Sequence, residues 1–83
     1  MLHSSILHSL DELQDDIQRV VAERIKKIRK TKGITQEQLA ELAGLNRTHL
    51  YRLESGKQSM TLRTLKIVAD ALSVRVRELV KDL

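Results

Sequence analysis

The stretch TQEQLAELAGLNRTHLYRLESGK, residues Thr35–Lys57, decides the fold of this 83-residue chain. Thr35 with the Gln three residues later spells a capping box, which predicts a short helix of about two turns ending before Gly44. Asn46 is a good N-cap for a second helix over 47–54. The stretch therefore predicts two short helices joined by a turn around Gly44, the helix-turn-helix arrangement.

The apolar residues of these two helices fall at helical spacing. In the first helix we expect Leu39 and Leu42 to face inward, with Ala40 where the two helices touch. In the second, Leu50 and Leu53 are three residues apart and would lock the helix to the core. The polar residues of the second helix are then left to face outward: Arg47, Thr48, His49, Tyr51 and Arg52.

Upstream, apolar residues recur every three or four positions from Ile6 to Ile28 and predict a helix over about 5–31. One rod and two pieces both fit, because Ser9 with Glu12 spells a capping box and Asp15 or Asp16 could cap a second start. The basic residues of this helix are expected on its exposed polar side: Arg24, Lys26, Lys27, Arg29, Lys30 and Lys32.

Downstream, Thr61 is expected to cap a helix over 62–72, and a last helix is expected near 75–82. The apolar face of the first of these comprises Leu62, Leu65, Val68, Ala69 and Leu72. No stretch shows the two-residue period of a strand. The chain is therefore predicted to be all-α, with room for one small domain only.

The charge distribution and the absence of Cys indicate which partner and which compartment to expect. Residues 1–20 hold four acidic residues and one basic residue, whereas residues 21–83 hold seven acidic and fourteen basic ones. A basic domain attracts polyanions, which makes double-stranded DNA the first partner to test. Without Cys, neither a disulfide nor a thiolate site is possible, so a cytoplasmic, nucleoid-associated protein is expected.

Several other classes of function are not expected. No apolar run is long enough for a membrane span. His3, His8 and His49 lack partners at ligand spacing, so no metal is expected. The chain has neither a nucleophile elbow nor a phosphate-binding loop, so it is not expected to be an enzyme or to carry a cofactor. No small-molecule ligand is evident.

The pattern TQxxLA, then Gly44, then LExG resembles the lambda-repressor-like, Cro-type (XRE) helix-turn-helix regulators of bacteria and phages. The likeness covers about residues 21–80. It implies a lambda-repressor-like five-helix DNA-binding domain over 19–83. About the N-terminal helical extension over 1–18, which the apolar periodicity predicts, the resemblance says nothing. Within the family, NRTHL followed by SGKQSMTL is most similar to the controller proteins of restriction-modification systems, which autoregulate an operon.

The resemblance also implies roles for individual residues. Those matching positions that face base edges are Arg47, Thr48, Arg52 and, at a more variable position, His49. Arginine suits this task because its fork binds guanine O6 and N7 together. The expected phosphate contacts are Gln36, Asn46, Lys57, Gln58, Ser59 and Thr61. Arg29 and Glu54 match an internal ion pair.

The C-terminal residues supply more apolar area than one short helix needs for docking. We therefore expect an isologous two-fold interface formed by Val74, Val76, Leu79, Val80 and Leu83. An N-terminal apolar stripe is expected either to pack on its own domain or to widen this interface: Leu2, Ile6, Leu10, Leu13 and Ile17. The favoured function is a homodimeric regulator that binds a pseudo-palindromic operator. The alternative is an antitoxin or interaction module whose N-terminal segment sequesters a partner protein.

Overall fold

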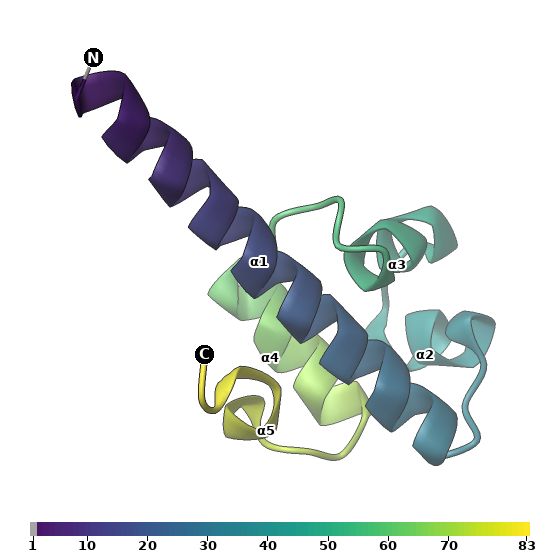
Figure 1. Ribbon diagram of the computed structural model, residues 1–83. Coiled ribbons are helices and arrows are strands. Elements are labelled where there is room, and N and C mark those ends of the chain that lie inside the picture. The colour runs from purple at the N-terminus through teal and green to yellow at the C-terminus, as the bar shows by residue number, and fades with distance from the viewer. Residues whose placement is uncertain (1) are drawn as a thin grey trace.

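The computed structural model describes the backbone of residues 2–83 and the side chains of residues 16–83. Its helices are α1 (Leu2–Thr31), α2 (Gln36–Ala43), α3 (Arg47–Glu54), α4 (Leu62–Ala71) and α5 (Val76–Val80), as Figure 1 shows. No strand occurs between residues 2 and 83, which confirms the all-α class. None of these helices combines the length and apolar character that a membrane crossing requires.

Local hydrogen bonds set the limits of α2 as the sequence predicts. The Thr35 hydroxyl accepts from the backbone N–H of Gln38 at 3.1 Å, and the Gln38 side chain accepts from the N–H of Thr35 at 2.9 Å. Gly44 ends the helix at φ 66°, and its N–H donates to the carbonyls of Ala40 and Glu41. A left-handed residue costs glycine little, so the chain turns sharply here toward α3.

The other predicted caps are also present. Asn46 Oδ1 accepts from the N–H of Thr48 at 2.7 Å at the start of α3. Thr61 Oγ1 accepts from the N–H of Thr64 at 3.1 Å at the start of α4. The last helix is shorter than predicted, because Arg75 makes no side-chain cap bond and the backbone is already extended at Lys81.

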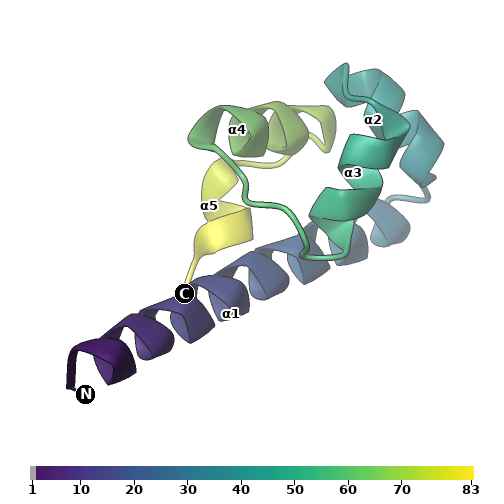
Figure 2. The same ribbon diagram turned by 90° about the horizontal axis from the view of Figure 1, so that it is seen from above.

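The core lies where the C-terminal half of α1 meets the other helices. Its largest fully buried side chains come from every helix: Ile25, Leu39, Leu50, Leu53, Val68, Leu72 and Leu79. Figure 2 shows α5 between α1 and α4, and α3 beside the C-terminal half of α1. Of the two motif helices, α3 packs directly on α1, whereas α2 packs on α3 and α4.

Two residues expected on apolar faces are exposed instead. Leu42 is 62% exposed, because the buried face of α2 is centred between Leu39 and Ala40 and leaves Leu42 to one side. Leu62 is 84% exposed, because it lies in the first turn of α4, where no neighbouring element covers it. Helical spacing predicts which side of a helix is apolar. It does not predict where along that side a neighbouring helix stops covering the residues.

The first helix is one continuous rod. It runs without interruption past Ser9, Asp15 and Asp16, so the alternative of two pieces is wrong. It also passes without a break through the expected domain boundary between residues 18 and 19. Figures 1 and 2 show its C-terminal half packed on the body of the molecule and its N-terminal half extending away from it.

The basic residues of α1 do not form one solvated face. Arg24 Nη1 donates to the carbonyls of Leu79 at 3.2 Å and Lys81 at 2.6 Å, which fastens the C-terminal end of α5 to α1. Arg29 is only 7% exposed. The four lysines of this group are exposed as expected: Lys26, Lys27, Lys30 and Lys32. The expectation is wrong for Arg24 and Arg29, whose partners on α5 and α3 lie far away in sequence.

Candidate nucleic-acid interface

A buried ion pair positions α3 against α1. Arg29 Nε donates to Glu54 Oε2 at 2.7 Å and Arg29 Nη2 donates to Glu54 Oε1 at 3.0 Å. The third guanidinium nitrogen, Nη1, donates to the carbonyl of Ile34 at 2.8 Å. A planar guanidinium fixes direction as well as distance. The C-terminal end of α3 is therefore held in one orientation relative to α1 and the loop before α2.

The same carboxylate also holds the start of α2. Gln36 Nε2 donates to Glu54 Oε1 at 3.0 Å, across the angle between the two motif helices. Gln36 is half-buried, and its backbone N–H lies in the first turn of α2, where N–H groups lack partners within the helix. Glu54 therefore joins α1, α2 and α3 in one hydrogen-bonded network.

With its inner side fixed in this way, α3 presents one face outward. Leu50, Leu53 and Glu54 are buried. The exposed residues of the helix include Arg47, Thr48, Tyr51 and Arg52. In the part of the chain with described side chains, neither exposed arginine of α3 is engaged in an ion pair. Both guanidinium groups are available to an external acceptor.

A shallow cavity of about 390 Å³ lies between the start of α2 and this face. It is lined by Gln36, Arg47, Thr48 and Tyr51. Tyr51 is 58% exposed and was not among the expected contact residues, although it follows Arg47 by four positions, the spacing of neighbours on one helix face. The structure thus joins an aromatic ring and a phenolic hydroxyl to the basic and polar groups.

His49 lies apart from this cavity. It is half-buried, on the flank of α3 between the exposed face and the buried leucines, and it does not line the cavity. Of the four expected base-contacting residues, the structure therefore brings Arg47 and Thr48 together and places Arg52 on the exposed side, while His49 stands to one side.

The expected phosphate contacts are spread over two ends of α3. Asn46 lies at its start as the N-cap, and Thr61 lies beyond its end as the N-cap of α4. Between them, Ser59 Oγ accepts from Gln18 Nε2 of α1 at 3.1 Å. Lys57 is exposed, and Gln58 is half-buried. With Gln36, which donates to Glu54, four of the six expected phosphate contacts already make side-chain hydrogen bonds within the chain.

The residues expected at a dimer interface divide into three groups. Leu79 is fully buried in its own domain, so the expectation is wrong for this residue, which has no surface to offer a second copy. Val74, Val76 and Val80 are partly buried and pack against the core. Leu83 is 54% exposed. Of the five residues, Leu83 alone is exposed.

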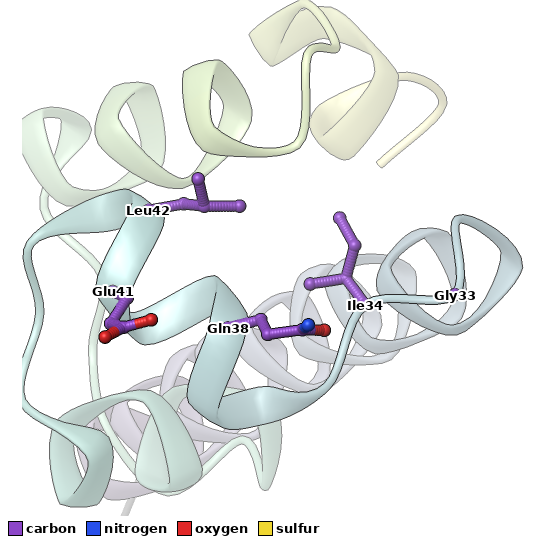
Figure 3. A pocket seen from close by; sticks show the side chains of 5 residues that line it. All are labelled: Gly33, Ile34, Gln38, Glu41 and Leu42. Atoms are coloured by element: carbon purple, nitrogen blue, oxygen red, sulfur yellow. The ribbon is translucent and has the colours of Figure 1, made fainter.

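A larger open cavity, of about 450 Å³, lies on another side of α2 (Figure 3). It is lined by Gly33, Ile34, Gln38, Glu41 and Leu42. Glu41 contributes a carboxylate and none of the lining residues is a cation, so this cavity does not suit a nucleic-acid phosphate. Among the residues with described side chains, no group of three or more His, Cys, Asp or Glu is placed to hold a metal ion.

Comparison with known proteins gives consistent results. Residues 25–79 match the helix-turn-helix family HTH_3. The chain is 41% identical over 64 residues to the control protein C.SmaI of Serratia marcescens, a match that covers 77% of this chain and 76% of that protein.

Two solved structures share the fold at similar identity. The restriction-modification controller protein C.AhdI from Aeromonas hydrophila is 34% identical, with a TM-score of 0.72 over 77% of this chain and 96% of that one. The controller protein C.Esp1396I, solved as a tetramer with its natural 35-base-pair operator, is 32% identical, with a TM-score of 0.69 over 78% of this chain and 96% of that one.

Proposed function

Because this chain belongs to the helix-turn-helix family HTH_3, we propose that it is a sequence-specific DNA-binding transcription regulator that acts as a homodimer. The observation that carries the proposal is the exposed face of α3, where Arg47, Thr48, Tyr51 and Arg52 lie outward while the opposite face is buried. A short, firmly seated helix with polar residues outward suits insertion into the major groove.

The chemistry of this face assigns different tasks to its residues. Arg47 and Arg52 each carry a fork that can bind guanine O6 and N7 together. Thr48 offers a methyl group to thymine and a hydroxyl to a base or phosphate. Tyr51 lies beside Arg47 in the shared cavity and adds a phenolic donor. These side chains would supply sequence preference.

Affinity would come from groups around the two ends of the motif. Gln36 and the free N–H groups at the start of α2 suit a backbone phosphate, because a helix N-terminus attracts anions. The exposed Lys57 after α3 suits a second one. Asn46, Gln58, Ser59 and Thr61 are the other phosphate contacts that we propose. Such contacts set the register of the protein on DNA but carry no sequence information.

A two-fold dimer would place two α3 helices in successive major grooves, roughly 34 to 36 Å apart. The operator is then expected to be a pseudo-palindrome. The likeness to control proteins of restriction-modification systems supports an autoregulatory role at such a site. The proposal involves no catalysis and assigns the protein to the cytoplasm, where its DNA target would lie.

The proposal is tested by selecting binding sites from random duplex DNA and titrating the selected site with two variants. Arg47→Ala is expected to lose about 1 to 3 kcal/mol on the selected site and to relax preference at one base position. Lys57→Ala is expected to weaken all sequences about equally and to flatten the salt dependence. Equal discrimination by Arg47→Ala and the unaltered protein would contradict the assigned role.

A further inference from the structure

The loop between α3 and α4 lies against the middle of α1. A Cβ added at Gly56 would stand only 3.4 Å from the Cα of Arg19, so little space separates the two backbones. Three residues further on, Ser59 Oγ accepts from Gln18 Nε2 at 3.1 Å. Figures 1 and 2 both show the segment between α3 and α4 beside α1. Residues 18 and 19 of α1 therefore form the surface on which this loop rests.

The same loop brings cations from three parts of the chain to the C-terminal end of α3. The backbone N–H of Lys57 donates to the carbonyl of Arg52 in the last turn of α3 at 3.2 Å. The side chains of Arg52 and Lys57 are exposed, and that of Arg19 is 62% exposed. The Gln18–Ser59 hydrogen bond keeps the loop, and with it Lys57, beside Arg19.

Arg19 lies outside the match to the helix-turn-helix family, which begins at residue 25. It is paired with Asp16, one turn earlier on α1, and the Asp16 side chain is 60% exposed. An ion pair this open to water is weak. A phosphate offers the guanidinium fork the same two-oxygen geometry as a carboxylate, and Arg binds both in this way. A phosphate can therefore replace Asp16 at little cost.

We propose that Arg19 binds a backbone phosphate of the DNA, next to the phosphate that Lys57 binds, and that this phosphate takes the place of Asp16 on the guanidinium group. The inference rests on the proposed function and adds α1 to the interface formed by α2, α3 and the loop. The contact supplies affinity and carries no sequence information.

The charge of α1 limits this contact to its edge. Beyond Arg19 toward the N-terminus, residues 11–16 hold four carboxylates and no cation. Because like charges repel, a DNA backbone is not expected to follow α1 along this stretch. The backbone instead crosses the helix at residue 19, where the loop meets it. Arg19 is thus the last cation of α1 that the duplex reaches.

The salt dependence of DNA binding by the full chain tests the contact. On the duplex site selected from random DNA, Arg19→Ala is expected to reduce the slope of log affinity against log salt by about 0.9 for each bound chain, the value of one phosphate contact. Arg19→Lys is expected to keep most of the slope, because it keeps the charge. Lys66→Ala removes a cation of similar exposure from an ion pair on α4 and is expected to keep the slope.

Exchange of the two charges within an ion pair separates a local contact from the general field of the protein. Asp16→Arg/Arg19→Asp keeps the net charge but places a carboxylate beside the loop, and is expected to weaken binding at least about tenfold. The matched exchange Lys66→Asp/Asp70→Lys on α4 is expected to change affinity less than about twofold. Urea unfolding checks that all variants retain the folded body.

Tethered cleavage tests the location directly, because the chain contains no Cys and an introduced thiol is unique. Arg19→Cys with an attached iron chelate is expected to cut the duplex backbone beside the site that α3 occupies. Lys66→Cys with the same reagent is expected to leave the duplex uncut.

The possible failures are distinguishable. If Lys57→Ala reduces the salt slope while Arg19→Ala leaves it unchanged, the inference is wrong and the proposed function stands. Equal reductions by Arg19→Ala and Lys66→Ala, or no cleavage from residue 19 in the bound complex, would also overturn it. If the unaltered chain binds no duplex, the proposed function fails and the inference fails with it.

Discussion

Arg29 and Glu54, 25 positions apart in the sequence, meet in a bidentate ion pair with N–O distances of 2.7 and 3.0 Å. Their side chains are 8% and 2% exposed. This pair, with Gln36 bound to the same carboxylate, fixes the angle at which α3 stands out from the body of the protein. The rigidity of the exposed face thus depends on three residues that need not touch DNA bases.

Removing one partner of this pair is expected to be severe. Arg29→Met leaves the Glu54 carboxylate buried without its cation and should cost about 3 to 5 kcal/mol of unfolding free energy. The double variant Arg29→Met/Glu54→Leu should recover much of this loss, because no buried charge remains. Urea denaturation measures both. A single variant as stable as the unaltered protein would show that the pair contributes nothing.

Two leucines of α2 offer a matched comparison. Leu39 is fully buried and Leu42 is 62% exposed. Leu39→Ala should cost about 2 to 5 kcal/mol through lost burial and a residual cavity, whereas Leu42→Ala should change stability by less than about 0.5 kcal/mol. Thermal or urea unfolding of the two variants, measured side by side, checks the prediction. Similar losses would mean that the packing of α2 differs from that described.

The turn between α2 and α3 depends on the backbone of Gly44, which has φ 66°. An added Cβ would meet no atom within 4 Å, so the cost of substitution comes from conformation alone. Gly44→Ala is expected to lose about 1 to 2 kcal/mol, the usual cost of the left-handed region for a residue with a Cβ. Gly44→Asn should lose less, because Asn tolerates this conformation. Urea unfolding checks the prediction: the midpoint of Gly44→Asn is expected between those of the unaltered protein and Gly44→Ala.

Arg24 is predicted to hold the C-terminal end in place. Arg24→Ala removes the donors to the carbonyls of Leu79 and Lys81, and should raise amide exchange within α5 about fivefold, corresponding to about 1 kcal/mol. Lys26→Ala, at an exposed position of the same helix, is the control. If Arg24→Ala and Lys26→Ala raise amide exchange in α5 equally, Arg24 does not hold α5 through these hydrogen bonds.

The sequence by itself determined the local structure of the motif. Capping residues at Thr35, Asn46 and Thr61 set three helix starts, and Gly44 set the turn, because each acts through hydrogen bonds or backbone angles within a few residues of itself. Periodicity identified the buried face of α3 and, in the part of α1 with described side chains, the buried face over residues 21–28. The base-reading roles of Arg47 and Arg52 remain predictions that follow from those faces and from the family.

Tertiary structure alone decided which residues lie at the limits of those faces. Leu42 and Leu62 are exposed and Leu79 is buried, because burial depends on where a neighbouring helix ends, and spacing along one helix does not contain that information. The partners of Arg24 lie 55 and 57 positions away, and Tyr51 joined the site through a cavity shared with α2. Contacts between distant segments arise only when the helices pack, so they could not be derived from local sequence.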